Sequence, residues 1–342
     1  MTGDGGYRAA ARSAALFDRS ERGKIVVAGA DRRAYLHAML TNDILSLPAG
    51  GGCYAAYLTP QGRMIADMVV LDLGDALLVD LDRAVAPTVL ARLDQFVFSE
   101  DVKLGDVSDA FGKLTLVGPA AARVVAGVAG RPGTPPMTAD ELAAWPPFRN
   151  ARAGFRGELL IVAASEEVGV AGFDLYVERP HLERLAAALV EAGAVRAGAD
   201  DWEALRIESG RPAFGADMDH DTIPLEAGIE ARAISFTKGC YPGQEVVIRV
   251  LHRGHGRIAR KLVGLAIDGT QMPGAGDALR AGDREAGRVT SAAWSPRLGG
   301  PIALAMVGRE FFEAGTELAV VHGDRTLAAR VIALPFGLRA EG

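Results

Sequence analysis

The residues best suited to covalent chemistry lie in one turn, the eight-residue stretch Lys238-Gly-Cys-Tyr-Pro-Gly-Gln-Glu245. Cys240, one of only two cysteines in the chain, stands two residues after Lys238. Glycine permits tight turns and proline fixes φ, so the stretch is expected to be a shaped turn rather than the middle of a helix or strand. A cysteine in such a turn is reachable, and a nearby ammonium favours its reactive thiolate. A loop cysteine without chemistry is the plain alternative.

Three further polar side chains interrupt apolar patterns elsewhere in the chain. Asp67 falls inside a strand expected over residues 64–73, and Asp174 inside an alternating strand over residues 172–177. Arg206 lies in a helix expected over residues 200–210. The residues alone leave simple interpretations open: a solvated strand residue, a strand-edge aspartate, and an arginine paired with Glu208 or another acid.

Composition narrows the class of protein. A chain of 342 residues is long enough for two or three domains, and its net charge of −6 with an isoelectric point near 5.6 argues against a nucleic-acid partner. Cys53 and Cys240 are too far apart for a disulfide framework or a zinc motif, so we expect no metal. No apolar run of about 18 residues predicts a membrane span, and residues 1–17 lack the apolar core of a signal peptide. We therefore expect a cytoplasmic protein that does not contact membranes.

The elements that must position these residues form two patterns. Residues 1–23 show no regular pattern, and a strand meander with helices follows. Short strands are expected over residues 24–28, 53–59, 64–73, 76–81, 102–107, 113–117, 159–163 and 172–177, and helices over 31–40, 84–98, 120–128 and 181–192. Residues 130–149 read as an irregular loop. In the helix over 200–210, Asp200 is the expected cap, with Glu203 completing a capping box.

The second pattern covers the end of the chain. Six short strands with glycine turns predict a small closed barrel. They are expected over residues 261–267, 278–280, 288–293, 302–307, 318–321 and 327–333.

A basic run separates the two patterns. It contains no acid, which stands out in an acidic protein, and comprises Arg249, His252, Arg253, His255, Arg257, Arg260 and Lys261. The run is open to three interpretations: attraction of a polyanion, a nucleic-acid patch, or a solvated strand and loop. The second is the weakest, because no aromatic residues are interleaved.

The stretch around Cys240 resembles the Lys-Gly-Cys-[Tyr/Phe]-x-Gly-Gln-Glu signature of the YgfZ family. These folate-binding proteins are related to the glycine-cleavage T-protein (aminomethyltransferase) and are linked to iron–sulfur cluster assembly and repair. The segment from Leu36 to Asp43 resembles the family's early "LH…LTND" segment, and residues 287–305 resemble the T-protein barrel domain. The resemblance therefore runs through most of the chain.

This resemblance implies an α+β fold. Two interleaved α+β subdomains over residues 1–257 would surround a central cavity, and a C-terminal β-barrel would occupy residues 258–342. The cavity would bind tetrahydrofolate or a C1-substituted folate.

The resemblance also implies roles for individual residues. The matching T-protein strand carries paired aspartates, one of which contacts the folate N10 region; here the pair reads Ala66-Asp67. Asp174 stands where a T-protein glutamate hydrogen-bonds the pterin ring. Arg206 matches an arginine that lines the folate cavity, and Arg249 lies at the basic edge, which would attract a polyanion such as a folate polyglutamate tail. Cys240, with Lys238 beside it, would be the reactive group.

Several functions follow from this pattern. The main hypothesis is a folate-binding protein of the YgfZ type that acts through Cys240 on iron–sulfur client or assembly proteins. The alternative is a folate-dependent aminomethyltransferase or demethylase of the T-protein type, so that an enzyme of this family would be a C1 transferase. A folate sensor that affects tRNA modification, and a cysteine hydrolase with His252 or His255 as its base, are more distant hypotheses.

Overall fold

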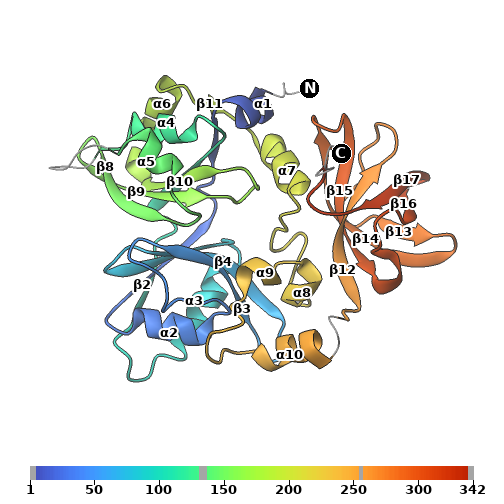
Figure 1. Cartoon of the computed structure of the whole chain (residues 1–342), viewed down its shortest axis with the longest axis horizontal. Coiled ribbons are helices and arrows are strands. Elements are labelled where there is room, and N and C mark those ends of the chain that lie inside the picture. Colours follow the sequence, from blue (N-terminus) through green and yellow to red (C-terminus); the bar gives the residue numbers. More distant parts are fainter. Residues whose placement is uncertain (1–4, 131–136, 254–256, 338–342) are drawn as a thin grey trace.

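A computed structural model describes residues 5–130, 137–253 and 257–337. Figure 1 shows three bodies: a sheet with helices at the top left, a second sheet with helices below it, and a barrel at the right. The expected α+β architecture with a C-terminal closed barrel is confirmed.

The first body is a six-stranded sheet, sheet A, and its helices. The strands are β1 (Ala15–Asp18), β7 (Phe111–Val117), β8 (Asn150–Phe155), β9 (Glu158–Ser165), β10 (Gly172–Glu178) and β11 (Val195–Arg196). Their order is β11-β1-β7-β10-β9-β8, antiparallel except for the β1–β11 pair. The helices are α4 (Ala121–Ala126), α5 (Ala139–Ala143), η1 (Arg179–His181) and α6 (Leu182–Glu191).

The second body is an antiparallel five-stranded sheet, sheet B. Its strands are β2 (Gly23–Ala28), β3 (Gly52–Leu58), β4 (Met64–Asp72), β5 (Ala76–Leu81) and β6 (Lys103–Asp106), and its helices are α2 (Arg32–Met39) and α3 (Ala86–Asp94). The order is β3-β4-β5-β2-β6. The chain leaves sheet A after β1, builds all of sheet B, and returns to sheet A at β7, so the two subdomains are interleaved.

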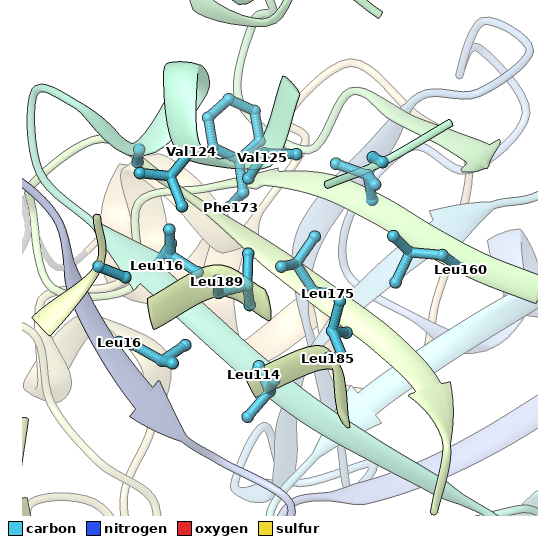
Figure 2. Close-up of a cluster of buried hydrophobic side chains, with 14 of the residues drawn as sticks. Leu16, Leu114, Leu116, Val124, Val125, Leu160, Phe173, Leu175, Leu185 and Leu189 are labelled. Atoms are coloured by element: carbon cyan, nitrogen blue, oxygen red, sulfur yellow. The ribbon is translucent and has the colours of Figure 1, made fainter. Parts of the chain in front are cut away.

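Strand alternation gives each sheet two chemically different faces. In sheet A, Leu114, Leu116 and Leu175 point toward α4 and α6, where leucines and valines form one core (Figure 2). The neighbouring residues Lys113 and Asp174 point to the opposite face. That face meets the inner face of sheet B, because one buried cluster contains side chains of both sheets.

Helices that follow sheet A close the space beside the two sheets. They are α7 (Ala199–Glu208), α8 (Pro224–Ala227), α9 (Glu230–Ala233), α10 (Gln244–Ile248) and the π-type turn η2 (Arg249–Arg253). Apolar residues of α8, α9 and α10 join the core between the sheets. Helix α7 runs between sheet A and the barrel (Figure 1).

The third body is the closed barrel. Its strands are β12 (Arg260–Ile267), β13 (Ala278–Ala281), β14 (Arg284–Ser295), β15 (Gly300–Gly308), β16 (Glu317–His322) and β17 (Arg325–Ile332), with η3 (Arg309–Phe311) between β15 and β16. All six expected barrel strands form. One set of apolar side chains fills the barrel, and a second set, including Leu304, packs its outer face against Trp202 and Leu205 of α7.

Three local expectations were wrong. Residues 5–12 form α1 rather than an irregular segment, because Tyr7, Ala9 and Ala10 pack against α7 and the barrel. Within the loop expected over 130–149, Thr138 accepts a hydrogen bond from Glu141 N (3.1 Å) and caps α5. Helix α7 starts one residue early: its cap is Gly198 instead of Asp200, and Asp201, not Glu203, accepts the hydrogen bond from the cap's backbone N–H (3.1 Å).

The docking of the barrel onto α7 can be tested at Leu304. This side chain is fully buried, so Leu304→Ala is expected to lower the free energy of unfolding by about 2–5 kcal/mol. Leu298→Ala is the matched control, because Leu298 is 46% exposed and its truncation is expected to change stability by less than about 0.5 kcal/mol. Urea unfolding measures both; equal effects would contradict the packing described here.

Candidate functional site

A cavity of about 540 Å³ lies where the two sheets and α7 meet. Six arginines and five acidic residues line it, together with four aromatic residues, so it is both charged and able to hold a flat ring. The lining residues are Arg19, Glu21, Arg22, Tyr54, Asp67, Met68, Val69, Asp82, Arg83, Ala84, Phe148, Glu166, Glu167, Trp202, Arg206, Arg211, Pro212, Ala213, Phe214 and Arg232.

Asp67 projects from β4 onto the wall of this cavity. Its Oδ2 accepts a hydrogen bond from the Tyr54 hydroxyl (2.8 Å), whereas its buried Oδ1 has no partner among the described residues. Burial raises the pKa of Asp67, and Arg22 and the Tyr54 hydrogen bond oppose that shift. The carboxyl group is therefore a poorly solvated base with one unused oxygen.

The preceding residue faces the other way. Ala66 is fully buried in the core between sheet B and its helices, with Met68 and Val70. Neighbouring residues of a strand point to opposite faces, so only one member of an aspartate pair at positions 66 and 67 could reach the cavity.

Asp174 lies behind the cavity wall rather than on it. Its Oδ1 accepts a hydrogen bond from Thr115 (2.7 Å), and its Oδ2 lies 3.2 Å from Lys113 Nζ. Burial, together with the charges of Glu167 and Asp80, raises the pKa of Asp174 to about 6, against the lowering effect of Lys113. Asp174, the carboxylate expected to bind the pterin ring, is thus held inside an ionic cluster and does not line the cavity.

That ionic cluster joins the two sheets. Lys113 Nζ also lies 2.9 Å from Asp80 Oδ2 and 2.6 Å from Glu167 Oε1, and neither Lys113 nor Asp80 is exposed. Arg22 donates from Nε to Asp80 Oδ1 (2.7 Å). Although burial opposes ionisation of Asp80, Lys113 and Arg22 hold its pKa well below the usual range. Glu167 and Arg22 are the members of the cluster that line the cavity.

Arg206 lines the cavity, but its guanidinium is engaged by protein groups. It donates to Asp217 (2.6 Å), to both oxygens of Glu203 (2.6 and 3.0 Å) and to Ser291 of the barrel (2.9 Å). Arg206 therefore ties α7 to the barrel. Glu208, the paired acid suggested by the sequence, instead accepts a hydrogen bond from Tyr7 (2.7 Å).

None of the residues of the turn around Cys240 lines the cavity. Cys240 is exposed, whereas Lys238 is buried and its Nζ donates to the backbone carbonyls of His37, Leu40 (2.6 Å) and Asn42 (3.2 Å) at the end of α2. Burial lowers the pKa of Lys238 to about 8. The amine is thus directed at α2, and its charge acts on the buried thiol of Cys53, whose pKa burial raises to about 12.

Only part of the basic run falls within the described residues. Arg249 is exposed at the start of η2, Arg260 pairs with Glu226 (3.2 Å), and Lys261 lines a second groove against the barrel. His255 lies outside the described residues. The run does not line the main cavity within the part of the chain that the structure describes.

Sequence reasoning missed most of the cavity wall. Arg232 stacks on the Tyr54 ring (4.8 Å) and Arg19 on the Trp202 ring (3.9 Å). Glu167 and Arg22 were also missed. These residues come from loops and a short helix, where no periodicity marks an inward-facing side chain; the adjacent acids Glu166-Glu167 after an apolar strand were the one available signal.

The described ranges contain neither a metal-ligand cluster nor a membrane-spanning helix. No group of His, Cys, Asp and Glu side chains there could hold a metal ion. None of the helices there has the length and apolar character needed to cross a membrane.

Comparison with known proteins gives consistent matches over most of the chain. A family profile described as the GCVT N-terminal domain matches residues 5–238. A second profile, the glycine cleavage T-protein C-terminal barrel domain, matches residues 260–336.

Curated relatives and a solved structure match as well. The chain is 32% identical to an aminomethyltransferase of Rubrobacter xylanophilus, covering 96% of this chain and 85% of that protein. It is 30% identical to an aminomethyltransferase of Saccharopolyspora erythraea, covering 98% and 90%. The crystal structure of the glycine cleavage system aminomethyltransferase T of Bartonella henselae superposes with a TM-score of 0.84 at 23% identity, covering 96% of this chain and 88% of that one. This last likeness concerns the fold.

Two glycines of the Cys240 turn should differ in importance. Gly243 has φ of 85°, and a Cβ there would lie 2.6 Å from Thr59 O; a Cβ on Gly239 would meet nothing within 4 Å. We expect Gly243→Ala to cost at least about 2 kcal/mol of stability and Gly239→Ala less than about 0.5 kcal/mol. Chemical denaturation of the two variants checks this; equal costs would mean that the turn is not held against residues 59–62.

Asp174 should make stability depend on pH. Because its folded pKa is raised to about 6 from an ordinary value near 4, the folded state binds the proton more tightly than the unfolded chain does. Its contribution to stability is therefore present at low pH and lost as pH rises from about 4 through 6.

Asp174→Asn, which stays neutral, should gain stability over the wild type across this interval, by ~1–3 kcal/mol. Thermal melts at a series of pH values measure the difference. The control is Asp109→Asn at an exposed ion pair, which should change little at any pH. A pH-independent difference for Asp174→Asn would contradict the assigned protonation.

Proposed function

The chain belongs to the family of the glycine cleavage T-protein, and on this premise we propose that it is a folate-dependent aminomethyltransferase. Such an enzyme transfers the methylene carbon of an aminomethyl group from a carrier thiol to two nitrogens of tetrahydrofolate; the C–S and C–N bonds break, and the free thiol and ammonia are released. The observation that carries the proposal is Asp67, a carboxyl group on the cavity wall whose Oδ1 has no partner among the described residues.

The residues of the cavity fit a folate. Tyr54, Phe148, Trp202 and Phe214 offer apolar ring surface, and the arginines can pair with the carboxylates of the glutamate tail. Glu167 Oε2 has no hydrogen-bond donor within the described chain, and a free carboxylate oxygen suits the N–H groups of a pterin edge. We therefore assign the binding of the ring to this wall and give Asp174 and Arg206 indirect, supporting roles.

The single aspartate does not weaken this proposal. Position 66 faces the apolar core, so a carboxylate there would not reach a ligand in the cavity. Asp67 alone, with Tyr54 fixing its Oδ2, supplies the carboxyl group that the site needs.

The chemistry that we assign to the chain is proton handling and electrostatic positioning. Bound tetrahydrofolate supplies the nitrogen that accepts the one-carbon unit. Asp67 can take the proton that an amine nitrogen releases as it forms a bond to carbon, because its raised pKa brings its basicity closer to neutral pH. Its negative charge, held where solvation is poor, also stabilises positive charge that develops beside it. The exposed Arg249 would add only a screened attraction for a polyglutamate tail.

A second function, an iron–sulfur role of the YgfZ type, is supported by the signature around Cys240. The thiol is exposed, so a client protein could reach it. One cysteine cannot hold a cluster that normally takes four ligands, so this role would use the thiol on a partner-bound species. In this proposal Lys238 maintains the shape of the turn through its bonds to α2.

Two substitutions separate the functions. Asp67→Asn should lower kcat/KM for tetrahydrofolate-dependent ammonia release from an aminomethylated lipoyl carrier by about 10²–10⁴-fold, because it removes the base. Cys240→Ala should leave that rate within about threefold, since the turn lies outside the cavity lining.

The matched control for Asp67→Asn is Asp72→Asn on the same strand, which pairs with Arg33 instead of lining the cavity. It should reduce stability without a comparable loss of kcat/KM. Transfer that depends on Cys240 and ignores Asp67 would reverse the assignment, and would favour the iron–sulfur role.

A further inference from the structure

Two charged side chains of the cavity wall are linked to the buried ammonium of Lys113, Glu167 directly and Arg22 through Asp80. Glu167 reaches the wall with 19% of its side chain exposed, and its Oε1 lies 2.6 Å from Lys113 Nζ. Arg22 reaches the wall with 18% exposed, and its Nε lies 2.7 Å from Asp80 Oδ1. Lys113 and Asp80 themselves are not exposed at all.

The connection is continuous from one wall residue to the other. Asp80 accepts from Arg22 at Oδ1 and from Lys113 at Oδ2, the latter at 2.9 Å. The Tyr176 hydroxyl adds a third bond to Asp80 (2.8 Å). Arg22 is therefore oriented through Asp80, and Glu167 directly, by the same lysine. Lys113 and Asp80, which hold these two residues, do not line the cavity, and Glu167 Oε2 and the Nη groups of Arg22 have no partners in the described ranges.

We propose that Lys113 is a positioning residue of the transfer site, which acts through Glu167 and through the Asp80–Arg22 pair to present an acceptor and a donor to the ligand. The inference rests on the proposed function, because it assumes that this cavity binds the folate. Lys113 does not line the cavity and is not a catalytic residue.

The charge balance explains why a lysine is needed. Asp80, Glu167 and Asp174 face Lys113 from β5, from the connection after β9 and from β10, and Arg22 is the other cation in contact with this group of acids. Without the ammonium, the buried Asp80 and Asp174 and the partly exposed Glu167 would face one arginine. Glu167 would then turn toward water or take up a proton, and in either case it would lose its place as an acceptor on the wall.

The test is a pair of double-mutant cycles in which calorimetry measures the Kd for tetrahydrofolate. In the first, Lys113→Met and Glu167→Gln are made singly and together. If Lys113 acts through Glu167, each single variant should raise the Kd for tetrahydrofolate by about tenfold or more. The Kd of the double variant should then exceed that of the weaker-binding single variant by no more than about threefold.

The second cycle is the matched control. Glu166→Gln changes the neighbouring acid, which lines the same cavity but lies 3.5 Å from Arg211 instead of contacting Lys113. The Kd of the double variant Lys113→Met, Glu166→Gln should equal, within about twofold, the value obtained by multiplying the fold-changes of the two single variants, as expected for independent sites. A lysine that merely stabilised the fold would couple equally to both acids.

The outcomes separate the two proposals. Wild-type protein that does not bind tetrahydrofolate would overturn the proposed function and this inference with it. Wild-type binding with independent effects in both cycles would overturn the role of Lys113 alone. If Lys113→Met does not fold, Lys113→Arg keeps the charge but displaces it, and the same two cycles made with Lys113→Arg decide the question by the same criterion.

Discussion

The contact between the buried ammonium of Lys113 and the carboxylate of Asp80 is the interaction on which the rest of the structure depends. Burying two charges costs several kcal/mol each unless geometry and additional hydrogen bonds compensate. Here Tyr176, Arg22 and Glu167 complete the arrangement. Lys113 and Tyr176 belong to sheet A and Asp80 to sheet B, so the hydrogen bonds and ion pairs among them determine how the two sheets face each other. The cavity lies at the margin of that contact.

Strand alternation lets one set of strands serve both the core and the site. In β10 the odd-numbered residues pack under α4 and α6, while Asp174 and Tyr176 face sheet B. In β4 the same rule sends Ala66 into the core and Asp67 to the cavity. A substitution at one position therefore affects stability, and at the next position it affects chemistry, although the two residues are covalent neighbours.

The sequence was sufficient for the fold and for part of the site. The six barrel strands and the interleaved α+β region were predicted, since glycine turns and period-two patterns are local signals. Asp67 and Arg206, two of the residues singled out from the sequence, line one cavity, and their roles in folate binding stay predictions. Lys113, Glu167 and Arg22 could not be predicted, because their pairs (Arg22–Asp80, Lys113–Glu167 and Lys113–Asp80) join positions about 30 to 60 residues apart and depend on how two sheets meet. The contact of Lys238 with the end of α2 could not be predicted for the same reason, because it joins distant positions of the chain. The long side chain donates to carbonyl groups that the fold brings near, and not to Cys240, its neighbour in sequence.

The central claim is that the cavity between the sheets is the folate site, with Asp67 and Glu167 on its wall. A crystal structure of the chain with tetrahydrofolate tests it most directly. We expect the ring system to lie between these two carboxylates, with the glutamate tail against the arginines of the wall. Density for the ligand in the groove beside β12 and β17, or in contact with Cys240 and not with Asp67, would contradict the account.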